Sequence, residues 1–253
     1  MSGNGKNPVY AFVLGAARSG TTAMVELLNT HPAICMGVER YKRYYRRHRS
    51  YPASLLTRER FFTFEQSDTN ARPDRKPWKP LYESLAAKWD SARVVGDKEG
   101  FAALPHIIEG IPEPRIIFML RDIAQVASSW NARAANVADK WPERNDFRAA
   151  VRRWNEANAL AASYADRLGP RLLVLEYERF FSGDDSYADR VMGFLTLEPG
   201  NPDFMRAYHE SVRHFREVVL RKSPLVFEGQ AEFLEREADM ETYERLSTIA
   251  RSS

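Results

Sequence analysis

The sequence of 253 residues is short of cysteine, of long apolar runs and of net charge. Cys35 is the only cysteine, which excludes a disulfide framework within the chain and a cysteine-based zinc site. We expect Cys35 to be a small buried hydrophobe. No apolar run approaches membrane-spanning length, and the opening MSGNGKNP lacks the basic-then-apolar order of a signal peptide. These absences predict a cytoplasmic protein without a membrane span.

The overall composition is that of an ordinary globular protein. A net charge of +3 is too small to indicate a nucleic-acid partner by itself. The length suits one α/β domain with a sizeable core, and no Gly/Ser linker, internal repeat or low-complexity segment divides the chain. We therefore predict a single domain over 1–253, with an insertion at about 39–90 and a helical tail from about 200.

Short apolar runs alternate with amphipathic stretches along most of the chain. Strands are predicted at 9–14, 93–96, 115–120 and 171–175. Helices are predicted at 21–28, 101–109, 122–133 and 147–167, and after Ser182-Gly183. Strands that alternate with helices form βαβ units. The expected fold is therefore α/β, a P-loop-like three-layer fold with a central, mainly parallel sheet flanked by helices.

The stretch GAARSGTT lies between the first predicted strand and the first predicted helix. A strand, a glycine turn and a helix N-terminus bring backbone N–H groups and a positive helix dipole to one point, which suits an anion. Ser19, Thr21 and Thr22 add hydroxyl donors, and Arg18 adds a planar guanidinium. A nucleotide triphosphatase would carry Lys where Thr21 follows Gly20. The stretch predicts an anion site without that lysine, and a glycine turn with no ligand is the alternative.

A second group of polar residues follows the strongest predicted strand. Arg121 comes directly after it, and Ser129 and Arg133 lie on one face of the next helix. Ligands of open α/β sheets bind outside the carboxyl ends of the strands, so Arg121 and Ser129 could hold a second phosphate. Lys98, in VVGDKEG, is expected at the same edge. The alternative for Arg121 is an ion pair with Asp122 or another carboxylate. The alternative for Ser129 is a polar residue on the helix surface without a ligand.

Taken in order, these motifs resemble a known family. GAARSGTT, the His31-Pro32 pair after the first helix, GDK, and RD with a serine eight residues on are similar to the sulfotransferases that use 3′-phosphoadenosine 5′-phosphosulfate (PAPS). The pattern resembles the tyrosylprotein and bacterial branch and not the cytosolic aryl and steroid branch. It covers about residues 9–180 and carries little into the tail.

The resemblance implies a role for each matching residue. The 5′-phosphosulfate would be held by Arg18, Ser19, Gly20, Thr21 and Thr22. The 3′-phosphate would be held by Arg121 and Ser129, with help from Arg133, and Tyr177 would lie near the adenine. Glu39 would be the catalytic base, Lys98 would contact the bridging oxygen, and Arg18 would add charge at the reacting group. No metal ion is expected, since fixed cations and N–H groups can stabilise the charge that develops.

The match has departures at the expected base. The cytosolic branch has a histidine two residues after a similar lysine, where this chain has Gly100, and the spacing from His31-Pro32 to Glu39 is one residue longer than expected. His31 and His106 are alternative bases. Glu39 could instead be a capping residue or pair with Arg40 or Arg43 on the surface.

The run RYKRYYRRHRSY, residues 40–51, is the densest concentration of charge. It could be a solvated helix face, stack on bases, or line a pocket for an acidic acceptor. Arg221 and Lys222 could be surface charges or a late donor-binding segment.

The function predicted is therefore transfer of a sulfuryl group from PAPS to an acceptor hydroxyl of a small molecule or glycan. The rival interpretations are a P-loop kinase that uses ATP and Mg²⁺, and a non-catalytic nucleotide- or nucleic-acid-binding protein. A nucleic-acid partner is not expected. The identity of the acceptor and the oligomeric state have no readable signal in the sequence.

Overall fold

In the computed structural model, residues 8–69, 71–138 and 141–252 are described, and within them five strands form one parallel sheet of order β2-β3-β1-β4-β5. The strands are β1 (Val9–Gly15), β2 (Ile34–Val38), β3 (Val94–Lys98), β4 (Arg115–Leu120) and β5 (Leu172–Glu176). Their residues are almost all buried, which is the condition of a parallel sheet covered on both faces. The α/β class and the parallel sheet predicted from the sequence are confirmed.

The register of the first three strands fixes what lies at their carboxyl ends. Val13 of β1 is paired with Lys98 of β3, and Val38 of β2 is paired with the same lysine. Glu39 follows Val38 directly, and its backbone N–H donates to the Lys98 carbonyl at 2.7 Å. The ends of β2 and β3 therefore place Glu39 and Lys98 side by side.

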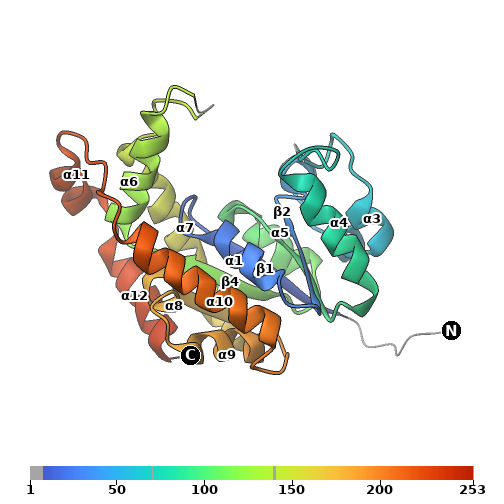
Figure 1. The fold of residues 1–253 in the computed structure, drawn as a ribbon. Helices are drawn as coiled ribbons and strands as arrows, with labels where there is room; N and C mark the ends of the chain where they lie inside the picture. Colours follow the sequence, from blue (N-terminus) through green and yellow to red (C-terminus); the bar gives the residue numbers. More distant parts are fainter. Residues whose placement is uncertain (1–7, 70, 139–140, 253) are drawn as a thin grey trace. The chain divides into compact units, whose positions relative to one another are not determined.

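The chain divides into two compact units that interleave along the sequence: 1–14, 22–117 and 185–208 form one, and 15–21, 118–184 and 209–253 form the other. The first unit carries the amino-terminal strands and α1 (Thr21–Leu28), except its first residue. Its further helices are α2 (Lys42–His48), η1 (Ala53–Leu56), α3 (Arg58–Phe62), α4 (Trp78–Lys88), η2 (Trp89–Ser91), η3 (Phe101–Ala103), α5 (Leu104–Gly110), α9 (Asp185–Phe194) and the start of α10 (Pro202–His214). Helix α4 packs against β2 (Figure 1).

The second unit is built around β5 and two long helices. Its helices are α6 (Ile123–Ala134), α7 (Phe147–Leu168), η4 (Gly169–Arg171), α8 (Tyr177–Phe180), the π-helical turn η5 (Phe215–Val219), α11 (Gln230–Glu237) and α12 (Met240–Ser252). Helices α6 and α7 lie side by side, and α12 packs on both α7 and β5 (Figure 1). Trp154 of α7 is 1% exposed and stacks on Tyr243 of α12 at 5.4 Å. From residue 202 onward the chain carries α10, η5, α11 and α12, with a non-helical stretch at 220–229 between η5 and α11.

Most predicted elements are confirmed within one or two residues, but β2 was missed. Ile34–Val38 reads ICMGV, which is short, contains Gly37 and follows the His31-Pro32 turn without a strong β signal. The strand exists because all five residues are buried and pair in parallel with β3. This correction matters for the site, because β2 delivers Glu39. No helix among the described residues has the length and apolarity needed to cross a bilayer.

Candidate active site

The loop between β1 and α1 is shaped by two glycines. Gly20 has φ of +90°, and a Cβ at this position would collide with the ring of Tyr177. A Cβ on Gly15 would lie 2.6 Å from the Ser19 hydroxyl oxygen and 2.7 Å from the Met119 carbonyl. Arg18 also has positive φ, +76°. The loop is therefore a tight cradle that depends on glycine, followed at once by the N-terminus of α1.

Arg18 and Ser129, 111 residues apart in sequence, are in direct contact. The Arg18 Nε–H donates to the Ser129 hydroxyl at 3.0 Å, and the Arg121 guanidinium donates to the Arg18 carbonyl at 2.8 Å. Trp130 Nε1 donates to the Ala17 carbonyl at 3.1 Å. The loop and the residues that follow β4 therefore form one hydrogen-bonded cluster, as the two-phosphate hypothesis requires.

Arg121 is fixed on several sides. Its guanidinium lies 4.3 Å over the Tyr177 ring, and its Nε is 3.6 Å from Glu178 Oε1. Trp154 Nε1 donates to its carbonyl at 2.8 Å. The Arg121 Nε is buried and has no hydrogen-bond partner among the described residues. Of the carboxylates that the sequence-based alternative allowed as partners of Arg121, Asp122 instead caps α6 by accepting from the Gln125 N–H at 3.0 Å, and Glu178 is the one that forms the ion pair.

The remaining predicted donor-binding residues differ in exposure. Ser19 is 1% exposed, and its hydroxyl donates to the Ala16 carbonyl at 2.7 Å, so this side chain holds the loop together. Thr21 is buried and Thr22 is exposed. Arg133 lies one helical turn beyond Ser129, with its guanidinium 4.3 Å over the Trp141 ring. Thr22 belongs to the first unit, whereas the others belong to the second.

Glu39 and Lys98 form an ion pair in the first unit. Lys98 Nζ lies 2.8 Å from Glu39 Oε1, and Lys42 Nζ lies 2.5 Å from Oε2. Burial alone would raise the pKa of Glu39, but the charges and hydrogen bonds of Lys98 and Lys42 outweigh it and lower this pKa to about 2. The carboxylate is therefore ionised, and its side chain remains 29% exposed to solvent.

Two buried carboxyl groups beside Lys98 were not singled out in the sequence. Asp97 and Glu99 are 0% and 1% exposed. They alternate with Lys98 along GDKEG, and alternation in a strand sends neighbours to opposite faces. This alternation of Asp97, Lys98 and Glu99 is the signal in the sequence that indicates a pair of buried carboxyl groups.

The alternative bases have other environments. His31 is 7% exposed, and its Nδ1 accepts from the Ala33 N–H at 3.0 Å. Burial, together with Lys88 and Arg93, lowers its pKa, which favours the neutral ring in that structural contact. His106 packs near Tyr45 at a ring distance of 6.0 Å. Cys35 is fully buried, as expected, and burial raises its pKa to about 11.

The Arg/Tyr run divides into a buried and an exposed side. Arg40, Tyr41, Tyr45 and Tyr51 are at most 2% exposed, while the exposed members of the run include Arg43, Arg46, Arg47 and Arg49. Of the alternatives for this run, a solvated face therefore describes only its exposed members and not Tyr41, Tyr45 or Tyr51. Buried rings cannot form the stacking platform that single-stranded nucleic acid would need.

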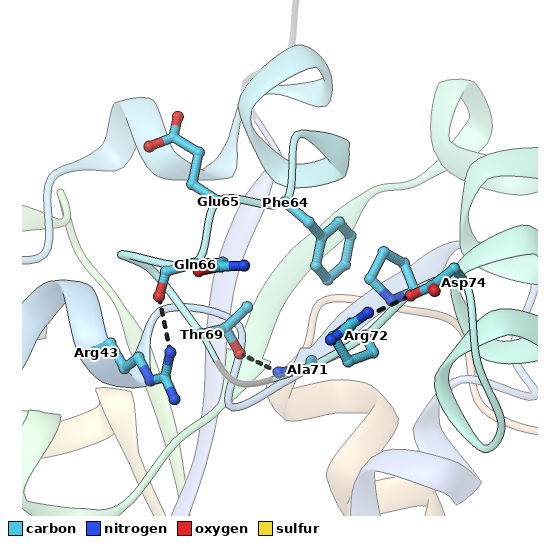
Figure 2. Close-up of a pocket in the computed structure, with 9 residues that line it drawn as sticks. Arg43, Phe64, Glu65, Gln66, Thr69, Ala71, Arg72 and Asp74 are labelled. Carbon is cyan, nitrogen blue, oxygen red and sulfur yellow. Dashed lines mark hydrogen bonds and ion pairs between the residues drawn. The ribbon is translucent and has the colours of Figure 1, made fainter.

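A cavity of about 490 Å³ lies beside this run in the first unit. Its wall includes Arg43, Gln66, Thr69 and Arg72 (Figure 2). The Thr69 hydroxyl donates to the Glu39 carbonyl at 2.9 Å, so the cavity wall is tied to the backbone of Glu39. Arg72 is 3.5 Å from Asp74, whereas the Arg43 guanidinium donates to the Gln66 carbonyl at 2.9 Å. Arg43 thus keeps a charge that no carboxylate of the described residues neutralises.

Comparison with known proteins identifies the family. The model of the sulfotransferase family matches residues 9–202, well over half of the chain. The chain therefore belongs to the sulfotransferase family, and the resemblance seen in the motifs is confirmed.

Curated relatives in the same family are distant. Protein-tyrosine sulfotransferase 1 of Danio rerio is 22% identical over 224 residues, which are 85% of this chain and 58% of that protein. Protein-tyrosine sulfotransferase 2 of Gallus gallus is 24% identical over 219 residues, 82% of this chain and 54% of that protein. The chain spans little more than half the length of these relatives.

Solved structures share the fold. The sulfotransferase domain of the curacin biosynthetic pathway has a TM-score of 0.55 at 14% identity, covering 96% of this chain and 98% of that domain. The corresponding domain of the Synechococcus PCC 7002 olefin synthase has a TM-score of 0.54 at 16% identity, covering 99% of this chain and 98% of that domain. A mouse sulfotransferase complexed with PAP (3′,5′-adenosine bisphosphate) has a TM-score of 0.54 at 12% identity, covering 96% of this chain and 89% of that chain.

Proposed function

We propose that this protein transfers a sulfuryl group from PAPS to an acceptor hydroxyl. The observation that supports this most directly is the cluster in which Arg18 contacts Ser129 and Arg121 contacts Arg18. It joins a glycine loop suited to one anion to a second group of cations and hydroxyls suited to another. A donor with phosphates at both its 5′ and 3′ positions fits such a pair of sites, whereas ATP offers no 3′-phosphate.

The residues present fit this donor in two respects. Gly20 lies directly against the Tyr177 ring, so the glycine loop is adjacent to the residue proposed for the adenine side. The buried Arg121 Nε has a donor to offer. We propose that the loop residues Arg18 to Thr22 hold the 5′-phosphosulfate and that Arg121, Ser129 and Arg133 hold the 3′-phosphate, with Tyr177 on the adenine side.

Glu39 is the proposed base. The acceptor hydroxyl loses its proton to the Glu39 carboxylate while its oxygen attacks sulfur in line, and the bond from sulfur to the 5′-phosphate oxygen breaks. Lys98, with Arg18, would stabilise the charge on the leaving oxygen. A carboxylate with a pKa of about 2 is a weak base. If Lys98 changes partner from Glu39 to the leaving oxygen, the pKa of Glu39 rises toward its ordinary value and proton transfer becomes easier.

The cavity beside Glu39 is the proposed entrance for the acceptor. Thr69 joins its wall to Glu39, and Arg43 offers a guanidinium not neutralised by a carboxylate. A small molecule or glycan that carries a hydroxyl and an acidic group would suit this wall. Arg43→Gln should therefore raise KM for an acidic acceptor about tenfold and leave KM for a neutral one nearly unchanged.

Binding of the donor product tests the proposal. We expect 3′,5′-adenosine bisphosphate (PAP) to raise the midpoint of thermal unfolding, while ATP with Mg²⁺ gives little or no shift. A shift with ATP and Mg²⁺ alone would instead support the kinase interpretation. A non-catalytic nucleic-acid-binding protein would instead bind oligonucleotides with a steep dependence on salt, and this binding would survive Arg18→Ala.

A further inference from the structure

Asp97 and Glu99 are two carboxyl groups buried side by side, with little positive charge close to them. Both side chains are at most 1% exposed. The nearest guanidinium, that of Arg40, is engaged with Asp68 at 3.4 Å and with the Phe61 carbonyl at 2.9 Å. Two adjacent carboxylates cannot both stay ionised in such a place without a large cost. One of them must therefore hold a proton.

The hydrogen bonds of the pair indicate where that proton lies. Asp97 Oδ2 accepts from the Arg40 N–H at 2.9 Å and from the Tyr51 hydroxyl at 3.1 Å, and Glu99 Oε1 accepts from the Tyr41 N–H at 2.9 Å. The other oxygens, Asp97 Oδ1 and Glu99 Oε2, have no donor among the described residues. A proton on Glu99, donated to Asp97, satisfies both. Burial, together with the neighbouring Asp97 charge, raises the pKa of Glu99 well above its ordinary value.

The two backbone groups held by this pair follow Glu39 directly. Glu39 has φ of +50°, a left-handed conformation that is costly for a residue with a Cβ. Its N–H donates to the Lys98 carbonyl at 2.7 Å, and its carbonyl accepts from Thr69 at 2.9 Å. Such a conformation persists only where the surroundings determine it on several sides. Without the two carboxyl groups, the turn that aims Glu39 would lose the hydrogen bonds that hold the N–H groups of Arg40 and Tyr41.

We propose that Asp97 and Glu99 share one proton and, through the backbone N–H groups of Arg40 and Tyr41, act as positioning residues that orient Glu39. The consequence for catalysis rests on the proposed role of Glu39 as base. An error of about 1 Å in the position of a catalytic group can cost on the order of a hundredfold in rate. Neither carboxyl group needs to touch the substrate for this effect.

Glu99→Gln and Glu99→Met form a matched pair of tests. Glutamine can still accept from the Tyr41 N–H and donate to Asp97, as a protonated glutamate does, whereas methionine fills similar space without either bond. We expect Glu99→Gln to keep the rate of PAP formation from PAPS, with water as sulfuryl acceptor, within about threefold of the unmodified protein. Glu99→Met should lower kcat at least about tenfold with PAP affinity unchanged.

Two measurements separate this proposal from the proposed function. Hydrogen exchange of the Tyr41 amide should quicken about tenfold in Glu99→Met and stay unchanged in Glu99→Gln, whether or not PAPS is turned over. The carboxyl carbon of Glu99 should show the chemical shift of a neutral acid at pH 7, which the unmodified protein reveals even if Glu99→Met fails to fold. An ionised Glu99, or equal losses of kcat in the Gln and Met variants, would overturn the proposal. A protein that never consumes PAPS would overturn only the proposed function.

Discussion

At the scale of single residues, Glu39 is the proposed catalytic base and Ser129 is a proposed donor-binding residue. Glu39 is an ionised carboxylate between two lysines, and Ser129 is a hydroxyl in contact with the arginine of the glycine loop. Glu39 belongs to the first unit and Ser129 to the second. Substitutions of the two should therefore affect different steps, turnover for one and donor binding for the other.

Glu39→Gln should reduce turnover of PAPS by about a hundredfold or more, because an amide cannot accept the acceptor's proton. The Kd for PAP should change less than about threefold, since Glu39 is not among the residues proposed to hold the donor. Steady-state kinetics and calorimetry with PAP measure the two quantities. Glu83→Gln, an exposed change of the same kind on α4, is the control. Loss of PAP affinity in Glu39→Gln would show that the base assignment is wrong.

Ser129→Ala should weaken PAP about tenfold, because it removes one hydroxyl from the proposed 3′-phosphate site and releases the Arg18 side chain. Adenosine 5′-phosphosulfate, which lacks the 3′-phosphate, should lose much less affinity. Competition titrations with the two ligands measure the difference. Ser163 is an exposed serine on α7, and Ser163→Ala should change the affinity for neither ligand. Equal losses for both ligands would remove the 3′-phosphate role, and Arg121→Ala should show the same ligand preference.

At the scale of elements, the turn from β1 into α1 depends on one backbone conformation. Gly20→Ala should lower the free energy of unfolding by about 1–3 kcal/mol, since alanine strains a φ of +90° and its Cβ meets the Tyr177 ring. PAP affinity should fall as well, because the ring and the loop N–H groups would be displaced. Urea unfolding and calorimetry measure both effects.

Gly193→Ala in α9 is the matched control for that change. A Cβ at Gly193 would meet no heavy atom within 4 Å, and its φ is not positive. We expect Gly193→Ala to be neutral or to stabilise the protein by about 0.5–1 kcal/mol, as alanine does inside helices. Destabilisation by both substitutions would point to a general effect of the added methyl group and not to the geometry of the loop.

The elements also show how far local sequence signals reach. Arg115–Leu120 is a strand in the structure with the predicted bounds, because the five residues after Arg115, IIFML, are all apolar and buried. Asp122 caps α6 as its position predicted. β2 was missed because ICMGV has no comparable pattern, and its strand character comes from pairing with β3. Long apolar runs fix their own structure, whereas short mixed ones depend on a neighbour far away in sequence.

At the scale of the whole molecule, global stability should report the ionisation of both unusual carboxyl sites. The Glu39 pKa lies below its unfolded value, so its contribution is present above about pH 4.5 and is lost as the pH falls toward 2. The Glu99 pKa lies above its unfolded value, so its contribution is present below about pH 4.5 and is lost as the pH rises. The ionisation of Glu39 therefore makes the protein more stable as the pH rises, whereas the ionisation of Glu99 makes it less stable.

Urea unfolding of Glu99→Gln at several pH values tests the expected loss of stability as Glu99 ionises. Glu99 is faced by Asp97 on its own strand and by Glu39 and Tyr45 from the segment after β2. The unmodified protein should lose stability relative to Glu99→Gln as the pH rises above 4.5, with a slope of at most about 1.4 kcal/mol per pH unit. Glu39→Gln should show the reverse difference below pH 4.5, of about 1–2 kcal/mol in total after solvent screening. Parallel stability curves would contradict both assignments.

The division of the chain shows what its length alone left open. A single domain over 1–253 stays a prediction, and residues of the two compact units alternate along the sequence. The glycine loop belongs to one unit while the strand before it and most of the helix after it belong to the other. No composition change or linker marks these boundaries, because all but the one at 184/185 fall inside a helix or strand.

The sequence by itself determined the α/β class and the family, because these depend on local periodicity and on short motifs whose residues act together. It also identified Arg18, Arg121 and Ser129 separately, but only the tertiary structure brought the first into contact with the other two. The structure alone decided that Tyr41, Tyr45 and Tyr51 of the basic run are buried and that Asp97 and Glu99 hold the turn after Glu39. Burial and long-range hydrogen bonds arise from packing between distant segments, and no local pattern of residues encodes them.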